Sequence, residues 1–195
     1  MNTVMHNNLP NLFYFIKEFN EEHIRKLDKK VSIIYRNYSL KYNKKFILKI
    51  KDFCKRDKRK FFISNDINLA INLGLDGVYI PSFNKKLNIK ILNNKKHFLM
   101  IGSAHSINEI KIKEAQGVQL IFLGPLFKTT KSNHFLNPSK FNLLASKTNK
   151  KVIALGGINK HNLNKLKMIN SIGFASISYF ANNGKITKWI KIIKR

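Results

Sequence analysis

Cysteine is almost absent from this chain of 195 residues, in which Cys54 is the only one. A single thiol cannot form a disulfide within the chain or supply a cysteine-rich zinc site. Long hydrophobic runs are also missing: none approaches the roughly 20 apolar residues of a membrane-spanning helix. The asparagine-rich first ten residues lack the apolar centre of a signal peptide. These features predict a protein of a reducing, cytoplasmic compartment with no membrane partner.

Proline and glycine are scarce, with 4 and 9 residues, and no run of either marks a linker. Hydrophobic residues make up 44% of the chain and aromatic residues 11%, which is typical of a packed globular protein. A chain of this length has the size of one domain. We therefore expect a single domain over residues 1–195. The sequence does not set the oligomeric state.

Acidic residues are few: Asp and Glu number 10 against 37 Lys and Arg, which gives a net charge of +27. With such a charge, the Lys and Arg side chains could bind the phosphates of a nucleic acid. Only five of the cations are Arg, however, and the lysines are spread along the whole chain. Base-reading sites usually concentrate Arg. We therefore expect nucleic acid to be an unlikely partner and small phosphorylated molecules to be better ones.

Short apolar runs alternate with amphipathic segments along the chain. Near-continuous apolar runs of this length are typical of parallel strands that are buried on both faces. We expect strands at residues 12–16, 31–36, 60–64, 77–80, 97–101, 119–123, 152–155 and 173–178. Helical spacing predicts helices within 40–54, 69–73, 107–115, 163–169 and 186–193, the third of them begun by Ser106 and Glu109 as a capping box.

This repeated alternation predicts an α/β fold, a compact single-domain (β/α)8 TIM barrel. A doubly wound open sheet is the structural rival, since periodicity does not decide closure. In a barrel, functional residues are expected where the strands end. Polar and small residues do follow the expected strands.

One group of these residues is suited to a phosphate. Gly156 and Gly157 follow the seventh strand, and Ile177 and Ser178 close the eighth. Glycine lets backbone N–H groups approach phosphate oxygens closely. The alternative is a tight turn that needs positive φ.

A second group combines cations, hydroxyls, amides and one carboxylate, which suits a diphosphate with Mg²⁺. Each member also has a simpler interpretation: Asp66 as a helix cap, Arg36 paired with a neighbouring carboxylate, Lys131 as a solvated charge, and His105 bonded to a loop. The group comprises Arg36, Asn65, Asp66, Thr129, Thr130 and Lys131.

At these residues the sequence resembles the thiamine phosphate synthase / TenI superfamily from about residue 31 to 180. The motifs are Ile63-Ser64-Asn65-Asp66, Gly77-Val78-Tyr79-Ile80, Gly124-Pro125-Leu126-Phe127 with Thr129-Thr130-Lys131, and Ala154-Leu155-Gly156-Gly157-Ile158. Their order and spacing carry the resemblance.

The resemblance implies a compact barrel that joins a hydroxymethylpyrimidine diphosphate to a thiazole phosphate in thiamine biosynthesis. It implies Mg²⁺ as cofactor, held by Asp66 and Asn84. Arg36, Asn65, Asp66 and Lys131 would then be catalytic. The remaining positions would bind substrate: Thr129, Thr130, Gly156, Gly157, Ile177, Ser178 and His105.

The chain departs from the family pattern in the half that would bind diphosphate and metal. Ile34 and Tyr38 stand where the family has Gln and Lys, and Asn84 falls near its second metal-binding Asp. Ala104 replaces a Ser after strand five. The family's Thr-x-Thr-Lys is compressed, which leaves the register of Lys131 open by one residue.

Three functions follow in order of preference. The first is thiamine phosphate synthase, a transferase, with activity that motif erosion could reduce. The second is a TenI-like tautomerase or a catalytically degenerate relative that binds a thiazole phosphate. The third is a non-catalytic module that binds phosphate ligands or RNA.

Overall fold

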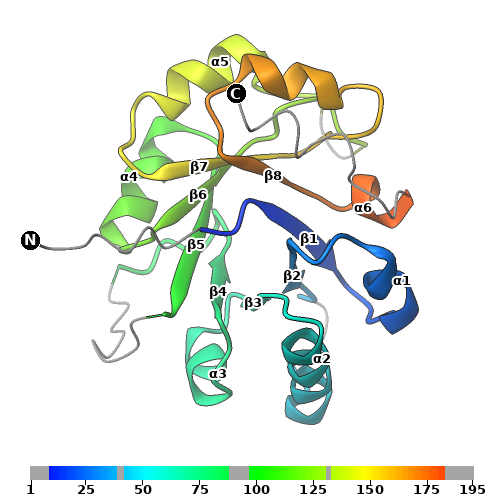
Figure 1. Cartoon of the computed structure of the whole chain (residues 1–195). Helices are drawn as coiled ribbons and strands as arrows, with labels where there is room; N and C mark the ends of the chain where they lie inside the picture. Colours follow the sequence, from blue (N-terminus) through cyan, green and yellow to red (C-terminus); the bar gives the residue numbers. More distant parts are fainter. Residues whose placement is uncertain (1–8, 39–41, 88–96, 131–132, 183–195) are drawn as a thin grey trace, which may run out of the picture.

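Eight parallel strands close into a barrel in the computed structural model, which describes residues 9–38, 42–87, 97–130 and 133–182 (Figure 1). Each strand pairs with its neighbours in sequence, and β1 closes the barrel against β8. The strands are β1 (Leu12–Ile16), β2 (Val31–Tyr35), β3 (Phe61–Ser64), β4 (Gly77–Ile80), β5 (Leu99–Ala104), β6 (Leu120–Leu123), β7 (Lys151–Leu155) and β8 (Gly173–Ser176). The predicted barrel is confirmed, and the open sheet is wrong.

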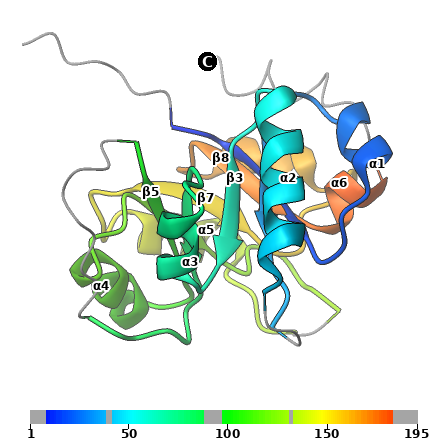
Figure 2. The same cartoon turned by 90° about the horizontal axis from the view of Figure 1, so that it is seen from below.

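Helices surround the strands, and α2 and α3 lie on the side of β2, β3 and β4 (Figures 1 and 2). The helices α1 and α6 lie side by side, where His23 Nε2 is 3.0 Å from the Phe180 carbonyl oxygen. The helical elements are α1 (Glu21–Lys26), α2 (Lys44–Arg56), α3 (Ile67–Asn72), α4 (Ile107–Ala115), α5 (Asn137–Ala145), the 3-10 helix η1 (Leu163–Met168) and α6 (Ser178–Asn182).

Local sequence explains where the longer helices begin and which face they bury. Asn43 caps α2 by accepting a hydrogen bond from the Phe46 N–H at 3.2 Å. Its residues at helical spacing, Ile47, Ile50 and Phe53, are buried against the barrel. The predicted cap of α4 is also present, since Ser106 Oγ accepts from the Glu109 N–H at 3.3 Å.

The barrel interior is filled by side chains from all eight strands. Phe13 lies 4.8 Å from Phe122 between ring centroids, and Phe15 lies 5.0 Å from Tyr79, both in edge-to-face geometry. The barrel interior is therefore a packed core that leaves no room for a ligand within it. The interior cluster is Phe13, Phe15, Ile34, Phe62, Tyr79, Ile101, Leu120, Phe122, Ile153 and Ala175.

Four details differ from the sequence expectation. The eighth strand ends at Ser176, so Ile177 follows it and Ser178 begins α6, whereas both residues were expected to close the strand. The fifth strand runs from Leu99 to Ala104, so Ala104 is a buried strand residue and does not follow the strand. Residues 163–168 form a 3-10 helix, whereas the spacing predicted an α-helix. The short helices α1, α5 and α6 were not predicted. The predicted helix at 186–193 lies outside the described residues.

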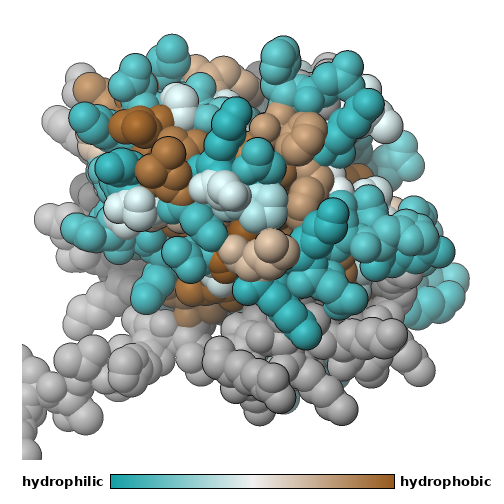
Figure 3. Space-filling view, turned by 90° about the horizontal axis from the view of Figure 1, so that it is seen from above, coloured by the Kyte–Doolittle hydropathy of each residue, from teal (hydrophilic) through white to brown (hydrophobic). Residues whose placement is uncertain are grey.

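The face of the molecule that includes α5 and η1 carries both hydrophobic and hydrophilic side chains (Figure 3). Asn142 of α5 joins these two elements, because its amide donates to the Met168 carbonyl at 2.8 Å and accepts from the Asn170 N–H at 2.7 Å.

Among the described residues, no helix is long and apolar enough to cross a membrane.

Candidate active site

The carboxyl ends of the eight parallel strands meet at one mouth of the barrel. Each predicted site residue that the structure describes lies at a strand end, in the loop that follows one or, for Ser178, at the start of α6. The packed interior beneath them closes the floor of the mouth. The predicted residues therefore share one rim, and their contacts decide how they are grouped on it.

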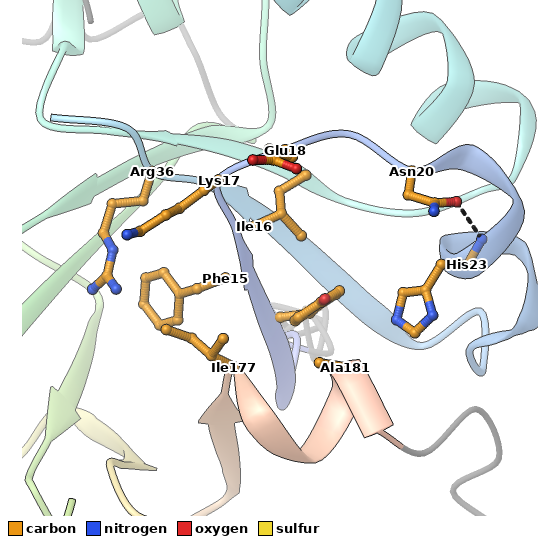
Figure 4. A pocket seen from close by; sticks show the side chains of 10 residues that line it. Phe15, Ile16, Lys17, Glu18, Asn20, His23, Arg36, Ile177 and Ala181 are labelled. Atoms are coloured by element: carbon orange, nitrogen blue, oxygen red, sulfur yellow. Dashed lines mark hydrogen bonds between the residues drawn. The ribbon is translucent and has the colours of Figure 1, made fainter. Parts of the chain in front are cut away.

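A cavity of about 370 Å³ opens between β1, β8, α1 and α6 (Figure 4). Two predicted residues line it, Arg36 from the end of β2 and Ile177 from the end of β8. The Arg36 guanidinium carbon lies 4.7 Å from the centroid of the Phe15 ring, within the range of a cation–π contact. Arg36 has no ion pair among the described residues, so the proposed pairing with a strand carboxylate is wrong.

Lys17, Glu18 and His23 are among the residues of this cavity that were missed. Figure 4 shows the Lys17 side chain extending toward the same side as Arg36, beside Phe15. Lys17 and Glu18 directly follow β1. The rule that strand ends carry the site predicts them, although they match none of the motifs.

The half predicted to bind diphosphate and metal is organised by two asparagines. Asn84 Nδ2 donates to Asn65 Oδ1 at 2.8 Å, so the loops after β3 and β4 meet here. Asn65 has φ of +63°, a conformation that Asn tolerates better than most residues. Asp66 follows directly and caps α3, where its Oδ1 accepts from the Leu69 N–H at 2.9 Å. The cap interpretation of Asp66 is confirmed.

The oxygen atoms of Asp66 and Asn84 determine which kind of metal site this part of the rim could form. The described residues hold no group of three His, Cys, Asp or Glu side chains suited to a metal ion. Asn84 Oδ1 already accepts from the Lys86 N–H at 3.1 Å, and Asp66 is the one carboxylate of the set. A single protein carboxylate fits a Mg²⁺ ion that is coordinated mainly by the oxygens of a diphosphate.

The half predicted to bind phosphate is built from the loops after β6 and β7. Gly156 and Gly157 have φ of +93° and +69°. A Cβ on Gly157 would lie 2.5 Å from the carbonyl oxygens of Phe127 and Lys128. The glycine pair is therefore required for a left-handed turn and for close approach of the β6 loop, which confirms the simpler interpretation of these residues.

Ser176 is a residue of this half that the sequence argument missed. Its buried Oγ donates to the Ile158 carbonyl at 3.1 Å and accepts from the Tyr179 N–H at 3.2 Å. It thereby ties the end of β8 to the loop after β7 and sets where Ser178 begins α6. A serine three residues before Tyr179 is the usual signal of such a cap.

The remaining predicted residues differ in their exposure, and one of them is not described by the structure. Thr129 is half-buried in the loop after β6, and Thr130 is exposed beside it. Lys131 lies outside the described residues. His105 is exposed, and its Nδ1 lies 2.9 Å from Glu109 Oε2.

Two tyrosines have raised pKa values: Tyr38, where the chain departs from the family pattern, and Tyr79 of the barrel interior. The Tyr38 hydroxyl lies 2.8 Å from Ser64 Oγ, and burial raises its pKa. Burial also raises the pKa of Tyr79 to about 12, against the opposing effect of hydrogen bonds to Ser103 and Arg36. Both hydroxyls are therefore protonated at neutral pH and can donate hydrogen bonds.

Comparison with known proteins decides the family. The sequence model described as thiamine monophosphate synthase matches residues 18–180. The chain belongs to this family. The thiamine-phosphate synthase of Prochlorococcus marinus is 33% identical to this family member over 158 residues, which are 71% of this chain and 44% of that protein. The enzyme of that name from Lysinibacillus sphaericus is 30% identical over 154 residues, 76% of this chain and 71% of its own length.

Solved structures agree on the fold. The thiamine phosphate pyrophosphorylase from Pyrococcus furiosus superposes on this family member with a TM-score of 0.69 at 18% identity, covering 95% of this chain and 96% of that one. The pyrophosphorylase from Bacteroides thetaiotaomicron gives 0.60 at 16% identity, with 95% and 93% covered. At these identities the likeness shows the barrel alone.

Proposed function

We propose that this chain is a thiamine phosphate synthase, a transferase that joins a hydroxymethylpyrimidine diphosphate to a thiazole phosphate. The observation that carries the proposal is the family match over residues 18–180, which includes all the predicted site residues. The rim geometry supports it, since both predicted halves occur at one mouth. A cytoplasmic location, a single domain and the absence of a nucleic-acid partner remain parts of this proposal.

The reaction breaks one bond and forms one. The bond between the pyrimidine methylene carbon and the diphosphate oxygen breaks, and the diphosphate departs with the electron pair. The lone pair of the thiazole nitrogen then forms the new carbon–nitrogen bond. Catalysis consists mainly of stabilising the departing charge and aligning the two rings.

We assign the stabilisation of that charge to the half of the rim around Arg36, Asn65 and Asp66, together with Lys131. The Arg36 guanidinium is fixed over Phe15, so it is oriented before the substrate arrives. Mg²⁺, when bound, would neutralise charge on the diphosphate. Asp66 would hold it, with the amide oxygen of Asn84 as the second protein donor.

We assign the thiazole phosphate to the opposite wall. The turn at Gly156 and Gly157 and the hydroxyls of Thr129, Thr130 and Ser178 would bind its phosphate through hydrogen bonds, and Ile177 would pack against the ligand. Ser176 fixes the distance between the loops of β7 and β8. His105 borders the rim from β5.

The test is to mix the purified full chain with both substrates and Mg²⁺, and to follow diphosphate release and the coupled product. Turnover that needs both substrates supports the proposal. Diphosphate release that does not depend on the thiazole phosphate, or no release, contradicts it.

A second candidate is a TenI-like relative that binds a thiazole phosphate and moves a proton on it. The pair of His105 and Glu109 favours this candidate, because the carboxylate orients the imidazole at the rim. Binding of thiazole phosphate without diphosphate release, and loss of tautomer exchange in His105→Gln, would favour it over the synthase.

A further inference from the structure

Lys113 of α4 is a lysine buried in the protein interior, with 0% of its surface exposed. Its Nζ donates three hydrogen bonds, to the Pro81 carbonyl at 2.8 Å, the Asn84 carbonyl at 2.7 Å and Gln116 Oε1 at 2.9 Å. These bonds use all three donors of the ammonium group, and all three acceptors are neutral oxygens. Burial lowers the pKa of Lys113 to about 8, opposed by the charge of Glu109. A cation in such a place is costly unless it is fully hydrogen-bonded.

Gln116 lies one turn further along the chain and completes the arrangement. Its Nε2 donates to the carbonyls of Asn84 and Lys86, both at 2.9 Å. Lys113 and Gln116 thus make four hydrogen bonds to the backbone of residues 81–86, the loop that follows β4. We call this segment the β4 loop. Its backbone is thereby attached to α4.

The barrel leaves room for the lysine at one position of β5. A Cβ on Gly102 would lie 2.7 Å from Lys113 Cδ and 3.0 Å from Lys113 Cγ. A larger residue at position 102 would displace the lysine stem. The buried cation is therefore accommodated by β5 as well as by α4 and the β4 loop.

The β4 loop carries Asn84, and the Asn84 side chain reaches the candidate site. Its amide donates to Asn65 Oδ1, and Asn65 precedes Asp66. A continuous chain of hydrogen bonds thus runs from Lys113 and Gln116, through the Asn84 backbone and side chain, to Asn65. A shift of the Asn84 backbone would move its amide away from Asn65.

We propose that Lys113 and Gln116 are positioning residues for the half of the site that binds diphosphate and metal, acting through the backbone of the β4 loop. The proposal rests on the proposed function. Neither residue touches substrate. Their role is to hold Asn84 against Asn65, where the chain lacks the second carboxylate of the family pattern.

The test compares Lys113→Met with Lys111→Met. Methionine matches the length of the lysine stem and removes the three donors. Lys111 is exposed on the same helix, so Lys111→Met removes the same charge without touching the β4 loop. Thermal unfolding monitored by circular dichroism establishes that each variant is folded, and Gln116→Leu serves as the second variant if Lys113→Met does not fold.

We expect Lys113→Met to raise the KM for the pyrimidine diphosphate and the Mg²⁺ concentration for half-maximal rate by about 10-fold or more. The KM for the thiazole phosphate, assigned to the opposite wall, should stay within about twofold. Lys111→Met should match the wild type. A purely structural role would lower the active fraction, and hence kcat, without separating the two KM values, and that result would overturn the inference.

Calorimetric titration with Mg²⁺ and inorganic diphosphate gives a readout that does not need turnover. Weaker binding in Lys113→Met than in Lys111→Met supports the inference. Equal affinities, or no binding by the wild type, overturn it. If the wild type binds Mg²⁺-diphosphate but does not turn over both substrates, the proposed function fails while calorimetry still decides the role of Lys113.

Discussion

Asp66 caps α3, and under the proposed function it would also supply the one carboxylate that holds Mg²⁺. These roles require different chemistry. The cap needs an oxygen acceptor, which serine also provides, whereas Mg²⁺ needs a charged oxygen ligand. Substitution can therefore separate them.

We expect Asp66→Ser to keep the stability of the wild type and to lose about 100-fold or more in turnover. Asp66→Ala should lose the same activity and a further ~1 kcal/mol of unfolding free energy, because its cap is gone. Urea unfolding and diphosphate release measure the two effects. Wild-type turnover in Asp66→Ser would mean that Asp66 is only a cap.

Cys54 is buried in α2 with 1% exposure, and burial raises the pKa of its thiol to about 12 from the ordinary 9.0. The folded thiol therefore keeps its proton in a pH range where the unfolded thiol ionises. Its contribution to stability is complete below pH 9 and is lost as the pH rises toward 12.

Between pH 8 and about 10.5, the unfolding free energy of the wild type should therefore fall by roughly 2 kcal/mol more than that of Cys54→Ala. Urea unfolding of both proteins at the two pH values measures the difference, because the other titrating groups are shared. The native thiol should also resist alkylation at pH 8.5 until the protein unfolds. Parallel pH dependence in the two proteins would contradict the prediction.

At the scale of elements, strands were predicted well because buried parallel strands are continuous apolar runs. The end of β5 was misplaced since Gly102, Ser103 and Ala104 have the composition of a loop. In the barrel they are paired with β6, and Gly102 leaves room for Lys113. The helix α1 buries a single residue, and α6 buries two adjacent ones, so neither shows apolar residues at helical spacing. The helix α5 begins without a side-chain cap, and all three were missed.

The candidate site was predictable in the same partial way. The strand-end rule placed Arg36, Asn65, Asp66 and Asn84 at one mouth, which the closed barrel supports. It could not predict the Asn65–Asn84 contact or the stacking of Arg36 on Phe15, because side-chain orientation depends on loops without a periodic pattern. Lys113 was unpredictable for a related reason: in a chain with 37 cations, nothing local distinguishes a buried lysine.

Arg59 joins elements at the opposite end of the barrel. Its buried side chain pairs with Asp57 at 2.6 Å and donates to the carbonyls of Ile24 and Leu27, at 3.0 Å and 2.7 Å. It thus fixes the end of α1 to the start of β3. Its planar group makes bonds in several directions that a lysine cannot reproduce.

We expect Arg59→Met to lose about 3 kcal/mol of unfolding free energy, since it leaves buried acceptors and Asp57 without their partner. Arg56→Met, at an exposed position of α2, removes the same charge and should change stability little. Urea unfolding of the three proteins at pH 7 checks this. A loss equal to that of Arg56→Met would assign the effect to net charge.

The whole molecule carries a charge of +27, and its 10 carboxylates cannot pair most of its cations. Repulsion between like charges disfavours the compact state and is screened by salt. We expect the unfolding temperature to rise by a few degrees between low and moderate NaCl concentrations. Differential scanning calorimetry measures it.

A variant with Lys44, Lys45 and Lys49 of α2 replaced by glutamine serves as the control. These lysines are exposed, so their removal should raise the unfolding temperature at low salt and reduce its salt dependence. A temperature that falls as salt is added would mean that attractive ion pairs outweigh the repulsion.

The closure of the barrel has a consequence for how this molecule can meet other copies of itself. Each of the eight strands has a hydrogen-bonded neighbour on both sides. The sheet therefore offers no open edge onto which a strand of another chain could add, and such edges are a common starting point for amyloid-like growth. Any self-association through the described folded part must use helix faces and loops, where the shared positive charge opposes it.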